Sequence, residues 1–170
     1  MLIDTIGRLS ARVADIFLWI CLAGLVAITA VVGWQVWGRY VLNDTPVWAE
    51  RTSLLLVLYF SLLGAAVGVR EQFHLGIVFI RDALPPALRM PARVVIHLLI
   101  GGFGAGMVWF GSQLAATTWT HSIPTIGISE SFTYIPVPLA GAAIVLFSLE
   151  HLLAIFAGQA DPPTGAAGSV

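Results

Sequence analysis

Three charged residues, Arg39, Glu50 and Arg51, stand close together in a chain that otherwise carries little charge. Arg39 ends one long apolar run, and Glu50 and Arg51 stand at the start of the next. Charged side chains at the edge of a membrane either extend toward water and lipid headgroups or hold a partner. Both interpretations stay open here: a solvated trio, or a group that secures a helix junction or a partner subunit.

Two histidines suggest a second kind of chemistry. His97 lies about one turn into the third apolar run, and His151 lies near the end of the fourth. In an antiparallel bundle the two imidazoles would lie at one depth, where they could ligate a haem iron. This hypothesis would make the chain a haem-binding membrane-anchor subunit of a respiratory dehydrogenase. The alternative is that backbone or lipid groups satisfy each imidazole separately.

The rest of the sequence contains no pattern typical of catalysis. No nucleophile stands beside a base, and there is neither a phosphate-binding loop nor a metal-ligand spacing. Cys21 is the one cysteine, which excludes an internal disulfide and a multi-cysteine metal site. The sequence therefore predicts neither an enzyme nor a resident cofactor.

The composition is typical of a protein that crosses a membrane several times. Of the 170 residues, 58% are hydrophobic and 10% are charged, whereas soluble domains carry about 25% charged residues. A net charge of −1 offers no basic face for nucleic acid. No apolar run carries a formal charge at its centre, where transport pathways usually have one. We expect an all-α integral membrane protein with no substrate site of its own.

Four apolar runs predict transmembrane helices at about residues 16–40, 47–69, 92–119 and 136–156. Each is long enough to cross a hydrocarbon core of about 30 Å. Residues 1–15 and 71–84 have apolar residues at helical spacing, which predicts amphipathic interfacial helices. Residues 1–157 then form one four-helix membrane domain. The tail over residues 158–170, rich in glycine, alanine and proline, is expected to be disordered.

Small residues predict where another helix can approach closely. Such residues recur in the second run and again in the third, and helix pairs in membranes favour them at contacts. The candidates for packing against another subunit are Gly64, Gly68, Gly102 and Gly106. Residues suited to the headgroup level are Trp34, Trp37, Tyr40, Trp48, Arg81, Arg89 and Arg93.

The arginines predict the orientation, since the chain has no lysine. Most of them fall at the amino end or between the second and third runs, and only two lie on the other side. Short cytoplasmic segments carry the excess of basic residues, so both termini are expected in the cytoplasm. The first group comprises Arg8, Arg12, Arg70, Arg81, Arg89 and Arg93, and the second comprises Arg39 and Arg51.

A string of short motifs resembles a known family over roughly residues 16–152. In order they are Gly38-Arg39-Tyr40-Val41, Trp48-x-Glu50, Leu63-Gly64-Ala65-Ala66, His74-Leu75-Gly76-Ile77, Leu84-Pro85, Ser122-Ile123-Pro124 and Tyr134-Ile135-Pro136-Val137-Pro138. Their order and spacing are similar to those of the small membrane subunit of tripartite ATP-independent periplasmic (TRAP) transporters, the Q-type small permease component.

The chain departs from that family pattern at a few positions. Arg51 stands where the family often has a second acid after Glu50, and Tyr59 stands where tryptophan is frequent. The segment after His74 lacks the acid that is frequent there. Arg39, Glu50, Arg70 and His74 remain as matched positions.

The resemblance implies a set of partners in the bacterial inner membrane. A large TRAP membrane subunit would hold the sodium and substrate sites and move in an elevator manner. A soluble periplasmic substrate-binding protein would deliver an organic acid. The small subunit would enlarge the static scaffold, contact membrane phospholipids, and help to dock the binding protein. The segment over residues 70–84 would brace the inner leaflet.

Overall fold

The computed structural model describes residues 2–44, 46–71, 86–124 and 127–157. These residues form an all-helical structure whose long elements are α1 (Leu2–Trp37), α2 (Val47–Arg70), α4 (Pro86–Thr117) and α6 (Pro136–Phe156). A short helix, α5 (Ser131–Tyr134), precedes α6. In the described ranges the extended pairing is confined to one isolated bridge between Ser122 and Ser129. The predicted all-α fold is confirmed.

The first hairpin closes through a π-helical turn, η1 (Gly38–Leu42), that continues α1. Asn43 ends the turn in the left-handed region, with φ of 52°, and its N–H donates to the Gly38 carbonyl. A Cβ on Gly38 would lie 3.0 Å from the Asp44 carbonyl oxygen and 3.3 Å from Pro46 Cδ. Glycine at this position therefore lets the chain fold tightly back into α2.

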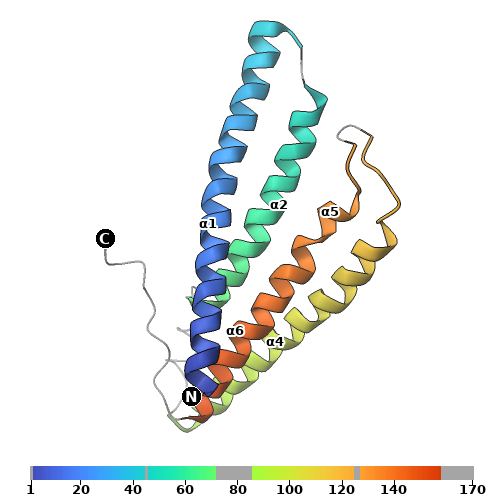
Figure 1. Cartoon of the computed structure of the whole chain (residues 1–170). Coiled ribbons are helices and arrows are strands. Elements are labelled where there is room, and N and C mark those ends of the chain that lie inside the picture. The colour runs from blue at the N-terminus through green and yellow to red at the C-terminus, as the bar shows by residue number, and fades with distance from the viewer. Residues whose placement is uncertain (1, 45, 72–85, 125–126, 158–170) are drawn as a thin grey trace.

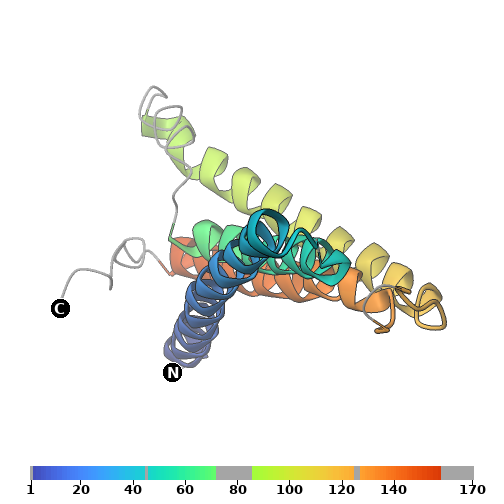
Figure 2. The same cartoon turned by 90° about the horizontal axis from the view of Figure 1, so that it is seen from above.

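The four long helices form two hairpins, α1 with α2 and α4 with α6, and α6 packs against all the others (Figure 1). Seen from above, α4 and α6 run alongside each other and α1 crosses toward them from one side (Figure 2). The buried core gathers where α1, α2 and α6 meet: Ala14, Ala66, Val67, Val69, Ala140, Ala143, Ile144 and Phe147.

Glycines set the close contact between α4 and α6. A Cβ on Gly141 would lie 2.7 Å from the Gly104 carbonyl oxygen and 2.8 Å from Met107 Cβ. A Cβ on Gly111 would lie 2.9 Å from Pro138 Cδ. The backbones can approach this far because these positions lack side chains.

The glycines predicted to contact another subunit lie elsewhere. A Cβ on Gly68, Gly102 or Gly106 would meet nothing within 4 Å. Gly64 faces α1, where a Cβ would lie 3.7 Å from Cys21 Sγ. Gly68, Gly102 and Gly106 therefore play no part in packing among the described residues, and contact with another subunit stays a prediction for them.

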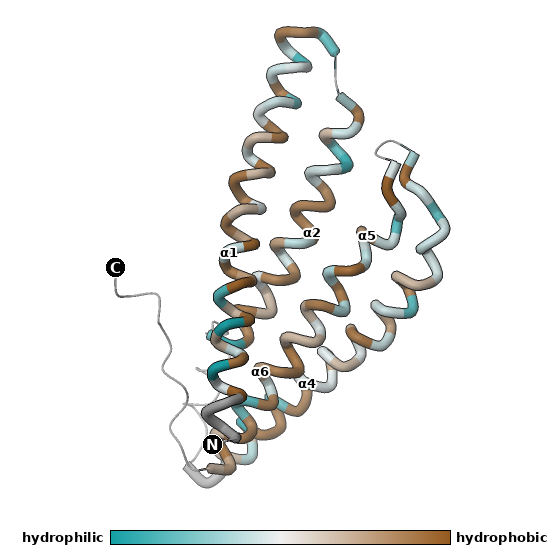
Figure 3. The backbone as a smooth tube through the Cα atoms, in the orientation of Figure 1, coloured by the Kyte–Doolittle hydropathy of each residue, from teal (hydrophilic) through white to brown (hydrophobic). Residues whose placement is uncertain are grey.

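Within the described ranges, four helices are long and apolar enough to cross a membrane: Ile6–Leu42, Val47–Arg70, Met90–Thr117 and Ser131–Phe156. Apolar residues dominate the middle of the long helices, and hydrophilic ones gather near the start of α1 and around its connection to α2 (Figure 3). The predicted second and fourth spans match α2 and α6 closely. The predicted third span begins later than α4, because Pro91 is accommodated inside that helix.

The amino-terminal segment is continuous with the first span, since α1 runs without a break from Leu2. Ser10 and Ala14 are buried against the rest of the bundle. Its predicted location in the membrane interface stays a prediction. The predicted interfacial helix at 71–84, apart from its first residue, and the predicted tail at 158–170 lie outside the described residues, as do His74 and Arg81.

Candidate functional site

A buried carboxylate joins three helices at the end of the bundle where α1 begins and α6 ends. Glu150 of α6 is 7% exposed, and its Oε2 accepts a hydrogen bond of 2.5 Å from Ser10 Oγ of α1. Arg70 Nε, at the end of α2, lies 3.7 Å from the same oxygen. Arg70 also pairs with Glu71 at 3.2 Å. We call Ser10, Arg70, Glu71 and Glu150 the polar junction.

Local sequence explains why the polar junction forms at this place. A charged carboxylate in apolar surroundings needs hydrogen bonds and an opposite charge, since it has left water. A Cβ on Gly7 would lie 3.4 Å from Glu150 Oε1, so this small residue leaves room for the carboxylate beside α1. Ser10 and Arg70 both engage Glu150, and Arg70 also pairs with Glu71, which suits a structural link between helices.

A pair of histidines adds the fourth helix to the same end. His151 is fully buried, and its Nδ1 lies 2.7 Å from the Phe147 carbonyl oxygen. Because a carbonyl oxygen only accepts, Nδ1 of His151 carries a proton. The His151 ring stacks on His97 of α4, with centroids 4.8 Å apart and an angle of 21° between the planes. The predicted meeting of His97 and His151 is thus confirmed.

The geometry of this pair does not support the haem hypothesis. Two axial histidines would have to approach an iron from opposite faces of the macrocycle, each pointing a ring nitrogen at the metal. Stacked rings 4.8 Å apart leave no space for a porphyrin between them. The two histidines instead link α4 to α6 beside the polar junction.

Three charged residues at the opposite end of the bundle are exposed. Arg39 lies in η1, and Glu50 and Arg51 lie in the first turns of α2. With the residues that the structure describes, none of the three forms an ion pair. We call these three residues the charged rim. The structure brings them to one end of the molecule without joining them into a site.

Aromatic residues surround the charged rim. Trp34, Trp37, Tyr40 and Trp48 are 45–81% exposed, and the Trp34 and Trp37 rings lie 5.3 Å apart. Rings of this kind favour the headgroup level of a bilayer. Their predicted role as lipid-interface residues, like that of Arg89 and Arg93, stays a prediction.

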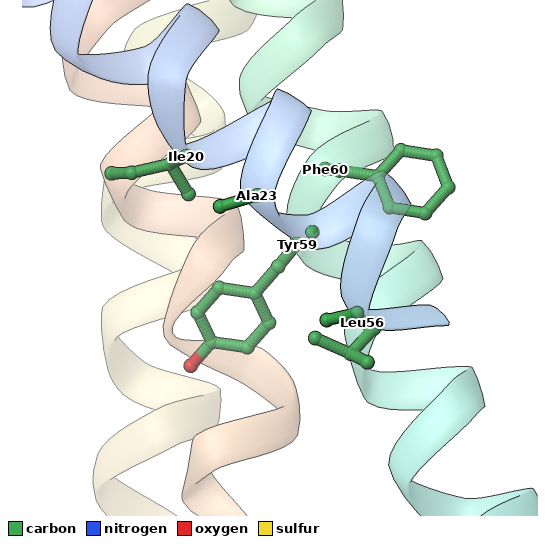
Figure 4. Close-up of a pocket in the computed structure, with 7 residues that line it drawn as sticks. Ile20, Ala23, Leu56, Tyr59 and Phe60 are labelled. Carbon is green, nitrogen blue, oxygen red and sulfur yellow. The ribbon is translucent and has the colours of Figure 1, made fainter. Parts of the chain in front are cut away.

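A groove between α1 and α2 offers no charged or metal-binding group. It measures about 270 Å³, and Figure 4 shows Ile20 and Ala23 of α1 near Leu56, Tyr59 and Phe60 of α2. The Tyr59 hydroxyl, its one side-chain polar group, donates to the Phe132 carbonyl at 2.9 Å. Among the described residues, no three histidine, cysteine or acidic side chains could hold a metal ion together.

Sequence reasoning missed Glu150 and Ser10. The available signal was a single acid in an otherwise uncharged apolar helix, directly before His151. An intramembrane acid requires a partner. Ser10 gave no signal of its own, because a serine between two arginines near an amino terminus is typical of a solvated helix.

Comparison with known proteins identifies the family. A sequence model of the DctQ component of tripartite ATP-independent periplasmic transporters matches residues 28–158. The chain belongs to this family. The match includes Arg70, His97, Glu150 and His151, whereas Ser10 lies before it. As a DctQ-family chain with four apolar helices, the protein is a transporter component and a multi-pass protein of the inner membrane.

Several curated relatives are similar to this DctQ-family chain. The sialic acid TRAP transporter small permease protein SiaQ of Vibrio cholerae is 29% identical over 128 residues, which covers 75% of this chain and 74% of the relative. The C4-dicarboxylate small permease protein DctQ of Rhodobacter capsulatus is 29% identical, covering 69% of this chain and 52% of the relative. The sialic acid permease protein SiaT of Haemophilus influenzae is 29% identical, covering 72% of this chain but only 20% of the relative.

Proposed function

We propose that this chain is the small scaffold subunit of a sodium-coupled TRAP transporter. In this role it stabilises the large transport subunit and carries no substrate site. One observation supports this above the others: the buried carboxylate of Glu150 is already engaged by Ser10 and Arg70 of the same chain. A charged substrate or coupling cation needs oppositely charged or polar groups at membrane depth. Apart from Glu150, no formally charged residue lies near the centre of a described span.

The partner set follows from the names of the relatives. The match spans one fifth of SiaT, which leaves four fifths of that permease protein for other functions. We assign the corresponding role here to a separate large membrane subunit that holds the transport site. A periplasmic substrate-binding protein would supply the substrate. The names of the relatives mention sialic acid and C4-dicarboxylates, which are both carboxylates, so the substrate class proposed is an organic acid.

The proposed orientation directs the charged rim to the periplasm. Described arginines at the opposite end of the bundle are Arg8, Arg12, Arg70, Arg89 and Arg93, and an excess of arginine is typical of the cytoplasmic side. Arg39 and Glu50 are then exposed where a periplasmic binding protein arrives, and they are candidates for helping to dock it. Charged residues at the rim of an interface mainly change the rate of association.

Reconstitution tests the scaffold role directly. The large subunit is placed in liposomes with and without this chain, and uptake of the acid is followed under a sodium gradient with the binding protein present. We expect uptake to require this chain, while the chain alone binds no substrate by calorimetry. Full uptake by the large subunit alone, or tight binding of substrate to this chain alone, would refute the proposal.

A single substitution separates assembly from selectivity. Since Glu50 is exposed and forms no ion pair with the described residues, Glu50→Ala should leave the fold intact. We expect it to reduce co-purification with the large subunit more than it changes the preference among substrates. Thr52→Ala on the same helix end is a matched control. Unchanged co-purification of Glu50→Ala would count against a contact at this residue.

A further inference from the structure

One stripe of α2 combines a cation with an apolar surface. Arg51, Leu54, Leu55 and Leu58 follow the spacing of three and four residues that places side chains on one helical face. Together with Ile123 and Thr133 they line a groove of about 280 Å³ between α2 and the segment leading into α5 and α6. We call this the Arg51 groove. The guanidinium marks one end, and the leucines continue for about 10 Å along the helix.

The walls of the Arg51 groove are held in place by hydrogen bonds. The Ile123 N–H donates to the Ile128 carbonyl at 2.8 Å, and the Gly127 N–H donates to the Ile123 carbonyl at 2.8 Å. Next to Leu58, the Tyr59 hydroxyl donates to the Phe132 carbonyl and ties α2 to α5. The groove is therefore formed within the chain before any ligand enters, which lowers the entropic cost of binding.

The chemistry of the lining selects an amphiphile with an anionic head. Arg51 is exposed, and it forms no ion pair with the described residues. Its neighbour Glu50 stands about 100° further round the helix and does not line the groove. Arginine binds phosphate oxygens with two parallel hydrogen bonds, and aliphatic side chains pack against hydrocarbon. A small soluble anion could bind the Arg51 guanidinium, but it would make no contact with the apolar leucine side chains that line the rest of the groove.

We propose that the Arg51 groove binds one glycerophospholipid. Its phosphate lies on the Arg51 guanidinium, and one acyl chain lies along Leu54, Leu55, Leu58 and Ile123. Arg51 also lies at the membrane level where a phospholipid has its phosphate. Trp48 stands one turn before it at the end of the span, and indole rings favour the headgroup level. The proposal requires only that α2 crosses the membrane, and it is independent of the scaffold role proposed above.

Photolabelling tests this site. The full chain is reconstituted in nanodiscs that contain phosphatidylglycerol with a photoactivatable acyl chain, and labelled residues are located by mass spectrometry. We expect the label to concentrate on residues 54–58 and on Ile123. Arg51→Gln should lower labelling there by about fivefold, the loss expected for one basic residue at an anionic lipid surface. Arg51→Lys should retain most of the labelling.

Matched variants exclude trivial explanations. Arg39→Gln removes the same charge from the same end of the bundle but outside the groove, so it should leave the labelling unchanged. Leu58→Trp fills the groove and should reduce labelling even though Arg51 is present. Equal labelling of the exposed Trp109 and Phe110 on α4, unaffected by any variant, would overturn the proposal. Loss of the label when the large subunit is added would also overturn it, since protein would then occupy the groove.

Discussion

Replacing Glu150 with alanine tests whether the polar junction holds the helices together. The substitution removes the acceptor of the Ser10 hydrogen bond, and a hydrogen bond to a charged group contributes about 1.5–3 kcal/mol. Arg70 loses less, because it lies 3.7 Å from Glu150, is 19% exposed and keeps Glu71 at 3.2 Å. We therefore expect the free energy of unfolding to fall by about 2–3 kcal/mol, below the cost of breaking a fully buried pair.

Two further variants separate the hydrogen bond from the charge. Glu150→Gln keeps the volume and an oxygen that Ser10 can reach, so its cost should be about 1 kcal/mol. Ser10→Ala leaves the carboxylate without its donor. If the two residues act through one bond, the combined Ser10→Ala and Glu150→Ala variant should cost less than the two single costs together, by about 1 kcal/mol or more.

The assay is reversible unfolding of the purified chain in mixed micelles, followed by helical circular dichroism. Glu50→Ala is the control, since it removes an exposed acid from the other end of the bundle and should change stability by less than about 0.5 kcal/mol. If Glu150→Ala were no more costly than Glu50→Ala, or if the double variant were additive, the junction would not stabilise the fold as argued.

Two further predictions concern the contacts of α6 and α5. Gly141→Ala places a Cβ 2.7 Å from the Gly104 carbonyl oxygen, which should cost about 1–3 kcal/mol in unfolding free energy. Gly106→Ala, which meets nothing within 4 Å, should be neutral or slightly stabilising in the same assay. Tyr59→Phe removes the hydrogen bond to the Phe132 carbonyl, so amide exchange in α5 should become faster while circular dichroism stays unchanged.

Several features of the structure were predictable from particular residues. The charge-free runs ended by Arg39 and by Arg70 predicted the first two spans, because an uncharged stretch of this length can satisfy its backbone in lipid only as a helix. The equal depth of His97 and His151 predicted that they would meet, and they do. The haem hypothesis based on this pair is not supported, because equal depth in the membrane does not determine how the two imidazole rings are oriented.

The glycines of α4 illustrate a feature that the sequence did not predict, namely which face of the helix contacts α6. Gly102 and Gly104 both lie in the third apolar run, yet a Cβ on Gly104 would meet Gly141 and Ile144 of α6, whereas one on Gly102 would meet nothing within 4 Å. In a soluble helix the apolar face would identify the buried side. Here lipid and protein interior are both apolar, so periodicity of hydrophobic residues does not identify which face of α4 turns inward.

By itself the sequence determined the number of spans, their approximate ends and the segregation of arginine, because the bilayer acts on each helix separately through hydrophobicity and charge. The tertiary structure decided what depends on two helices at once. Burial of Glu150 beside Ser10 joins residues 140 positions apart, and the Arg51 groove exists only because Ile123 and Thr133 lie against α2. Such contacts follow from how helices rotate and cross, which short-range sequence patterns do not specify.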